Sequence, residues 1–143
     1  MDELDQRLLS ALAADSSTPV AALARKLDVA RSTVQARIER LERTGAIAGY
    51  TIRLGDVESR RRIRATALLQ VDPRSTPGIL QRLRPLPQIE SCITTTGRVD
   101  LIVQIVSETT QELDETLDRI GAIPGVRTTE SLIHLGTRLD RRV

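Results

Sequence analysis

Apolar side chains recur at a helical period in three segments of the N-terminal third of the chain. We expect the first segment to begin after Asp2, whose carboxylate can cap a helix. The second begins with a capping hydroxyl on Thr18 and with Pro19 at its first helical position. Residues 28–30 then form a tight turn before the third segment. The three apolar stripes are Leu4, Leu8, Leu9 and Leu12; Val20, Leu23, Ala24 and Leu27; and Val34, Ile38 and Leu41.

The second and third segments, joined by this turn, predict a helix-turn-helix, in which one helix braces and the next enters the DNA major groove. The third helix runs from about Arg31 to Thr44, and Ser32, Ala36 and Arg43 point away from its buried stripe. Small residues allow close approach to bases, and hydroxyl, amide and guanidinium groups bond to bases and phosphates. The alternative is a solvated helix face, which also carries Arg and Gln. The predicted DNA-binding residues are Arg31, Ser32, Thr33, Gln35, Ala36, Arg37 and Arg40.

Gly45 ends the third helix, and residues 46–54 then alternate between apolar and other side chains as a strand does. A strand here indicates a winged variant of the helix-turn-helix or a link to a second domain. The basic run at residues 60–64 either touches the DNA backbone or is a solvated connector. We therefore expect a DNA-binding domain over residues 1–50, a linker strand and connector over 51–63, and a second domain over 64–143.

The period becomes that of β-strands from Arg64 onward. Strands are expected at residues 64–71, 89–96, 101–106 and 126–135, with a helix after the first strand and another after the third. The order βαββαβ is that of a ferredoxin-like α+β domain, in which two helices cover one face of a four-stranded sheet. The other face would be bare and apolar in a monomer, so the pattern predicts self-association. The apolar residues expected on that face are Leu68, Ile102, Val106 and Ile133.

Composition narrows the choice of partner. Only Tyr50 is aromatic, which argues against binding of single-stranded nucleic acid by base stacking. The net charge of +2 is unevenly placed, because residues 1–64 hold 12 Lys and Arg against 9 Asp and Glu, whereas residues 65–143 hold 9 against 10. The basic excess therefore lies with the helix-turn-helix, as contact with phosphates requires.

No catalytic or metal-binding pattern is found in the sequence. Cys92 and His134 are the only residues of their kinds, so no internal disulfide and no Cys/His metal cluster is expected. Nucleophile motifs and Gly-rich phosphate loops are also missing. The acidic N-terminus is unlike a secretory signal, and no apolar run is long enough to cross a bilayer. We expect a protein that is not an enzyme, has no cofactor or membrane partner, and is cytoplasmic and nucleoid-associated.

Five stretches of the sequence carry a family resemblance: LDQRLLSALAAD, ALARKLDVARSTVQARIERLERTGAI and GYT in the first half, and TGRVDLIVQI and PGVRTTESLI in the second. In this order and spacing they resemble the Lrp/AsnC family of feast/famine transcriptional regulators over essentially the whole chain. The resemblance implies an N-terminal helix-turn-helix that binds double-stranded DNA. It also implies a βαββαβ domain, called RAM, that dimerises and often senses an amino acid. Members form homodimers that commonly assemble into octamers, as tetramers of dimers.

The resemblance further implies an effector site between dimers, near the loop before the third RAM strand. Members often have Gly-x-aromatic-Asp in that loop, and this chain has Gly97 and Asp100 but Val99 at the aromatic position. Asp100 would accept hydrogen bonds from an amino acid's ammonium, while Arg98 and the main chain around Gly97 would hold its carboxylate. The alternative is a plain hairpin turn. The predicted effector-binding residues are Thr96, Gly97, Arg98, Asp100, Thr129 and Ser131.

A second departure from the family lies at Ala30, where members commonly have Ser or Thr as a helix cap. Either Ser32 takes over the cap and shortens the helix, or the helix begins more loosely.

The leading function is a sequence-specific DNA-binding transcriptional regulator whose assembly or DNA affinity responds to a small effector. One alternative is a nucleoid-type architectural protein that needs no ligand. A minor alternative is an enzyme like the siroheme decarboxylases, which resemble this family in both domains. Such an enzyme should need several His or Arg side chains around its tetrapyrrole, and this chain has one His.

Overall fold

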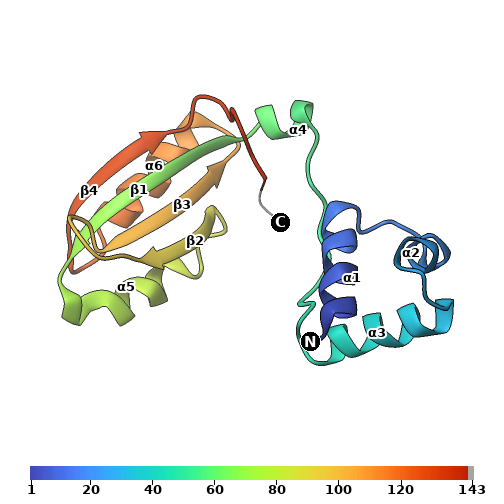
Figure 1. Ribbon diagram of the computed structural model, residues 1–143. Coiled ribbons are helices and arrows are strands. Elements are labelled where there is room, and N and C mark those ends of the chain that lie inside the picture. The colour runs from blue at the N-terminus through green and yellow to red at the C-terminus, as the bar shows by residue number, and fades with distance from the viewer. Residues whose placement is uncertain (142–143) are drawn as a thin grey trace. The chain divides into compact units, whose positions relative to one another are not determined.

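The computed structural model describes residues 1–141, which form two compact units (Figure 1): residues 1–53 with 140–141, and residues 54–139. The first unit contains α1 (Glu3–Ala14), α2 (Val20–Leu27) and α3 (Arg31–Arg43). The second contains α4 (Asp56–Arg60), β1 (Ile63–Val71), η1 (Pro73–Ser75), α5 (Thr76–Leu83), β2 (Ile89–Thr94), β3 (Leu101–Ser107), α6 (Thr110–Gly121) and β4 (Val126–Ile133). The predicted architecture, a helix-turn-helix followed by a βαββαβ α+β domain, is confirmed.

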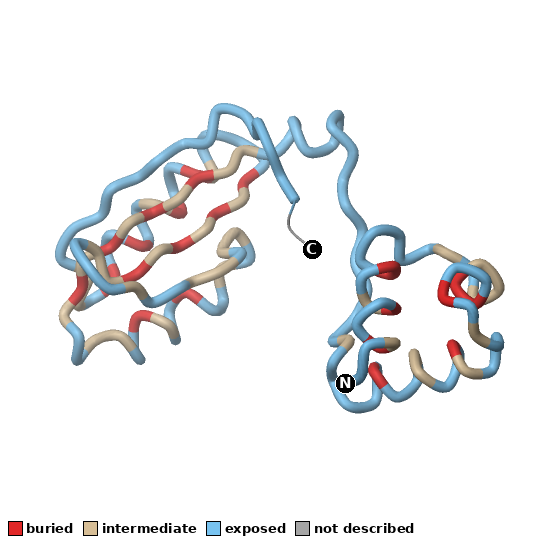
Figure 2. Tube along the Cα trace, in the orientation of Figure 1, coloured by how far each residue is buried: buried red, intermediate tan, exposed pale blue. Residues whose placement is uncertain are grey.

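The helical unit closes around the apolar stripes that the sequence predicted. Leu8 of α1, Leu23 of α2 and Val34 of α3 are each about 1% exposed and belong to one core cluster. Figure 2 shows buried stretches along all three helices. Asp28 ends α2 in the left-handed conformation at φ 56°, which turns the chain sharply toward α3. Gly45, at φ 80°, follows α3 as predicted.

The helix starts differ in part from the prediction. α1 has the expected cap, in which the Asp2 carboxylate accepts the Asp5 N–H while the Asp5 carboxylate accepts the Asp2 N–H. The prediction for α2 was wrong: Pro19 is the N-cap, and the Thr18 hydroxyl instead donates to the Asp15 carbonyl at 2.8 Å. Ala30 caps α3 without any side-chain hydrogen bond, so Ser32 does not take over that role.

The strand predicted at residues 46–54, and with it the expected wing, was wrong. These residues form no regular element, and the next one is the short helix α4, which the sequence did not predict. A strand needs a neighbour to satisfy its backbone hydrogen bonds, and no strand of the described residues pairs with this segment. Its apolar side chains beyond Ile47 are consequently exposed, with Ile52 80% and Tyr50 55% exposed, whereas Ile47 is half-buried against the helical core.

The second unit is a four-stranded antiparallel sheet with strand order β2-β3-β1-β4. The helices α5 and α6 lie together on one face (Figure 1), where Ala65 and Val103 are fully buried against a core that includes Ile79. Val71 ends the buried row of β1, and burial alternates along both central strands as the sequence predicted.

The opposite face carries no helix of this unit, and we call it the open sheet face. Leu68 and Ile102 are paired in register on it and are half-buried. The prediction that Ile133 lies there was wrong, because Ile133 pairs with the core residue Ala65. Its neighbour Leu132 occupies the open face instead, since a shift of one residue moves a side chain to the other side of a sheet. The described side chains of this face are Arg64, Thr66, Leu68, Gln70, Ser91, Ile93, Ile102, Gln104, Val106, Thr128, Glu130 and Leu132.

Gly125 is required where the turn between α6 and β4 meets η1. Its carbonyl accepts the Asp72 N–H at 2.8 Å, and its φ is 97°. A Cβ at this position would lie 2.1 Å from the Cβ of Ser75, so the approach leaves no room for a side chain. This contact fixes the end of β1 and the start of β4. Both strands contact the loop between β2 and β3, through Gln70 and Val71 of β1 and Glu130 of β4.

Candidate nucleic-acid interface and effector loop

The outer face of α3 is the candidate DNA-reading surface. Val34 and Leu41 turn inward with 1% and 2% exposure, which leaves Ser32 and Ala36 on the opposite, exposed side. Among the predicted DNA-binding residues, those that are exposed are Arg31, Ser32, Gln35, Ala36 and Arg40, and those that are half-buried are Thr33 and Arg37. Small side chains near the start of the helix and polar ones beside them can approach base edges in a major groove.

Two residues on this face were not among the predicted contacts. Glu39 is exposed and accepts a hydrogen bond from the Gln35 amide at 3.3 Å. Arg43 is exposed one turn further along, and the ion pairs of the described residues do not include it or Arg31. The helical period in the sequence already indicated that both lie on the outer side.

Arg37 and Arg40 have a different environment, because both face the N-terminus of α1. Arg37 Nη1 donates to Asp2 Oδ2 in a short ion pair and to Asp5 Oδ1 at 3.1 Å. Arg40 Nη2 donates to Asp5 Oδ2 at 2.6 Å. We call these four residues the α1–α3 charge cluster.

Burial differs sharply within the α1–α3 charge cluster. The side chain of Asp5 is 0% exposed, that of Arg37 25%, that of Arg40 46% and that of Asp2 53%. A buried carboxylate is tolerated only when it is paired and hydrogen-bonded. Asp5 is paired with both guanidinium groups, whereas the Arg40 side chain keeps about half of its surface in solvent.

The charges of the cluster are stabilised in their ionised forms. The hydrogen bond from Arg37 and the backbone bond from Asp5 lower the pKa of Asp2 to about 2. Burial raises the pKa of Asp5, but the Asp2 N–H and the two arginines outweigh it, so the net shift is downward. The same carboxylates raise the pKa of Arg37. Asp2, Asp5 and Arg37 are consequently charged at neutral pH, and with the Arg40 guanidinium the formal charges of the cluster sum to zero.

The sequence did carry a signal for this cluster. Asp2 and Asp5 are three residues apart at the start of one helix, and Arg37 and Arg40 are three residues apart on another. Each pair therefore shares one helix face, and the two faces are complementary in charge. The crossing of α1 over α3, which the sequence does not give, is what brings them together.

The loop between β2 and β3 holds four of the six predicted effector residues. Thr96, Gly97 and Arg98 are exposed, and Gly97 has a φ of 102°. Asp100 is half-buried, and its Oδ2 accepts the Val71 N–H at 2.9 Å. The Gln70 amide ties the loop down by donating to the Arg98 carbonyl at 2.8 Å.

Free hydrogen-bonding groups remain in this loop. Outside helices and strands, the hydrogen bonds of the described residues include no donor N–H from residues 96–99. Asp100 Oδ1 likewise accepts none of the described bonds, and the Arg98 side chain makes only a 3.7 Å ion pair with Glu130 among them while staying 76% exposed. The loop can therefore offer both anion-binding N–H groups and a fixed carboxylate oxygen.

Thr129 and Ser131 lie on the other side of the sheet from this ion pair. They pair in register with the core residues Leu69 and Ala67, whereas Glu130 pairs with Leu68 on the open face. Within the single described chain, the six predicted effector residues are thus not brought into one cavity. Both residues are exposed because β4 is an edge strand.

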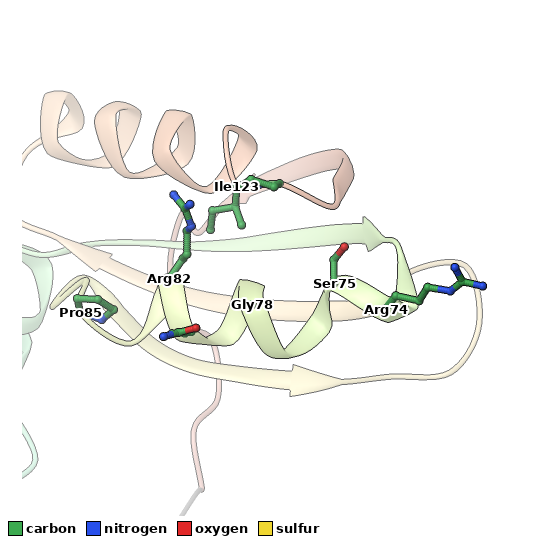
Figure 3. Close-up of a pocket in the computed structure, with 8 residues that line it drawn as sticks. Arg74, Ser75, Gly78, Arg82, Pro85 and Ile123 are labelled. Carbon is green, nitrogen blue, oxygen red and sulfur yellow. The ribbon is translucent and has the colours of Figure 1, made fainter.

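A depression of about 740 Å³ lies elsewhere, between α5 and the turn after α6 (Figure 3). Its lining includes Arg74, Gly78, Arg82 and Ile123, and none of the predicted effector residues. Figure 3 shows the Arg74 guanidinium directed away from that of Arg82, so the two charges do not converge on a ligand position.

The single cysteine and the single histidine of the chain lie among ordinary packing and hydrogen-bonding neighbours. Burial raises the pKa of the half-buried Cys92 thiol. His134 Nε2 lies 2.7 Å from the Thr66 hydroxyl, which donates to Gln104. Among residues 1–141 no group of His, Cys, Asp and Glu could hold a metal ion, and no helix there is long and apolar enough to cross a membrane.

The fold and this surface define a helix-turn-helix protein with a second, βαββαβ domain. The AsnC-type helix-turn-helix domain matches residues 1–42, and the Lrp/AsnC ligand binding domain matches residues 64–143, which is more than half of the chain. The chain therefore belongs to the Lrp/AsnC family of transcriptional regulators, as the resemblance implied. Its helix-turn-helix implies DNA binding, and its second domain is of the ligand-binding type.

Relatives and solved structures agree over nearly the full length. The chain is 33% identical to the transcriptional regulator LysM of Saccharolobus solfataricus, covering 96% of this chain and 95% of that one. Against the crystal structure of LrpA from Mycobacterium tuberculosis, the TM-score is 0.81 at 29% identity, covering 100% of this chain and 98% of that one. A Neisseria meningitidis transcriptional regulator solved in complex with L-Met has the same fold, with a TM-score of 0.87 at 19% identity and coverages of 98% and 93%.

Proposed function

We propose that this chain is a sequence-specific regulator in which the outer face of α3 reads the DNA major groove. The observation that carries the proposal is the exposed row of small and polar side chains, Ser32, Ala36 and Gln35, on a helix whose other side is held by α2. Ser and Gln side chains supply the hydrogen bonds that read base edges, and Arg31 supplies one for phosphate. Thr33 and Arg40, at the edge of this face, complete the surface.

Ala36→Glu tests this surface, because it adds bulk and a negative charge at the centre of the outer face. Glu is a good helix former and Ala36 is exposed, so the fold should persist. We expect affinity for duplexes selected by the wild-type chain from random-sequence DNA to fall by at least about tenfold, the order of one lost base contact. Fluorescence anisotropy measures the affinity.

The matched control is Ala13→Glu, which places the same side chain at an exposed position of α1. It should bind the selected duplexes as the wild-type chain does. Equal affinities for the two variants would contradict the assignment of the outer α3 face to DNA.

We also propose that a second copy of the chain covers the open sheet face. Ile93 is 54% and Leu132 47% exposed there, beside the half-buried Leu68, Ile102 and Val106. A contiguous apolar sheet face of this kind is unusual on a monomer. A pair of chains presents two helix-turn-helix motifs, which strengthens DNA binding through effective concentration. Further assembly to a tetramer of dimers is the family expectation.

Leu68→Glu tests this pairing by placing a charge at the centre of the open sheet face. A buried unpaired carboxylate opposes association, so we expect the variant to be monomeric by size exclusion with light scattering. Ala122→Glu, on an exposed residue at the end of α6, is the control and should leave the assembly unchanged. Monomeric wild-type protein, or an unaltered assembly in Leu68→Glu, would refute the proposal.

The effector we propose is a free amino acid bound at the loop of residues 95–100. The unpaired N–H groups around Gly97 suit a carboxylate, and Asp100 Oδ1 suits an ammonium. Thr96, Arg98, Thr129 and Ser131 are further candidates, from this chain or from a neighbouring copy. The L-Met complex of the Neisseria relative supports the ligand class. Binding would shift the population toward one assembly and so change which spacing of DNA-binding motifs is presented.

A thermal-shift screen of the twenty amino acids tests this effector. Because a ligand stabilises the state that binds it by RT ln(1 + [L]/Kd), at least one amino acid should raise the unfolding midpoint by several degrees at saturation. Asp100→Asn keeps an acceptor for the Val71 N–H but loses the charge, so it should fold normally and lose the shift.

A screen without any hit would instead favour the second candidate, an architectural DNA-binding protein that needs no ligand. That alternative is favoured by Val99 in place of an aromatic residue and by the placement of the effector candidates on both sides of the sheet. An enzymatic role has no comparable support, since the relatives are named as transcriptional regulators.

A further inference from the structure

The α1–α3 charge cluster cancels the charge of the recognition helix. α3 carries four arginines and two glutamates, which gives it a net charge of +2. The carboxylates of Asp2 and Asp5, both bonded to α3 arginines, bring the sum to zero. The helix that would approach DNA is therefore electrically neutral together with its immediate partners.

The two carboxylates also restrict where the arginines can reach. Arg37 is bonded to both carboxylates and only 25% exposed, so it can contact a phosphate only by leaving them. Its departure would leave the fully buried Asp5 with Arg40 alone, which is costly for a buried charge. Arg40 is 46% exposed but is also held at one end by Asp5.

We propose that Asp2 and Asp5 are specificity-determining residues that withhold Arg37, and in part Arg40, from the DNA backbone. This inference rests on the proposed DNA-binding function. Sequence-independent binding comes almost entirely from phosphate contacts, whereas specific binding also uses base contacts. Withholding an arginine from the phosphates therefore weakens sequence-independent binding more than it weakens specific binding. Discrimination then depends on Ser32, Gln35 and the other residues of the outer face.

The low pKa values of both carboxylates are consistent with this role, because the masking charges persist across the whole physiological pH range. The two carboxylates are also held in place by the fold, since Asp2 and Asp5 form the capping box of α1. The same two residues thus start one helix and neutralise another.

Asp2→Asn tests the proposal with little structural change. Asn caps helices as well as Asp does, and Asp2 is 53% exposed, so α1 should still form. The variant leaves one arginine charge uncompensated. For a random-sequence duplex, we expect the slope of log K against log salt to steepen by about 0.9. Lowering the salt from 200 to 50 mM should then tighten binding roughly threefold more in the variant than in the wild-type chain. The ratio of affinities for selected over random duplexes should fall.

Glu3→Gln is the matched control, since it removes the same charge from the same helical turn at a residue outside the described ion pairs. It should change the salt slope less than Asp2→Asn does. Equal slopes for the two variants, or equal tightening of Asp2→Asn on both duplexes, would overturn the proposal. Wild-type protein that binds neither duplex would instead refute the proposed DNA-binding function.

Arg37→Gln provides a second test of the proposal, which does not depend on whether Asp2→Asn folds. If Arg37 is withheld from phosphate, its removal leaves the wild-type salt slope unchanged. A slope shallower by about 0.9 would mean that Arg37 contacts a phosphate in the wild-type complex, and this result would overturn the inference. Circular dichroism of each variant checks that the helices are retained.

Discussion

The pairing of one buried carboxylate, Asp5, with two arginines is the interaction on which the DNA-binding unit depends. Asp5 is fully buried, so its charge must be compensated, and Arg37 and Arg40 of α3 provide the compensation. This requirement fixes α1 against one flank of α3. The opposite flank and the outer face are then left for solvent or DNA, with Ser32 and Ala36 at their centre.

The second unit is organised by a different constraint, a sheet with helices on one face only. Its core is complete without a partner, since the interior residues at the middle of β1 and β3, such as Ala65, Ala67 and Val103, are fully buried. Its open sheet face, in contrast, leaves apolar residues in contact with solvent, and Ile93 for example is about half exposed. A single helix-turn-helix with little net charge binds DNA weakly, and the proposed association through this face would present two such motifs together.

The sequence predicted what depends on local periodicity. Apolar stripes predicted α1, α2 and α3 in the first unit and α5 and α6 in the second, but not the short α4, and the alternation of apolar side chains predicted the strands of the sheet. It failed where a partner in space decides the outcome: residues 46–54 alternate like a strand but have no described strand to pair with. It also failed by one residue at Ile133 and Leu132, because the register on β1, which shifts between Gln70 and Val71, sets the face.

The candidate site was predicted less completely than the fold. Helical period alone placed the outer face of α3 correctly, since that face follows from the buried stripe of Val34 and Leu41. The engagement of Arg37 and Arg40 depends on how α1 crosses α3, which one sequence does not reveal. For the effector candidates, the sequence did not reveal that Ser131 and Thr129 lie on the helix-covered side of the sheet, because this depends on the pairing of β4 with β1.

A double-mutant cycle of Asp2→Asn and Arg37→Gln measures whether α1 controls how much of the charge on α3 reaches DNA. The quantity is the salt slope for a random-sequence duplex in all four proteins of the cycle. We expect Asp2→Asn to steepen the slope only when Arg37 is present, so that the double variant returns to the wild-type value. An equal steepening in both backgrounds would contradict this expectation, because the gain would then come from net charge and not from the release of this arginine.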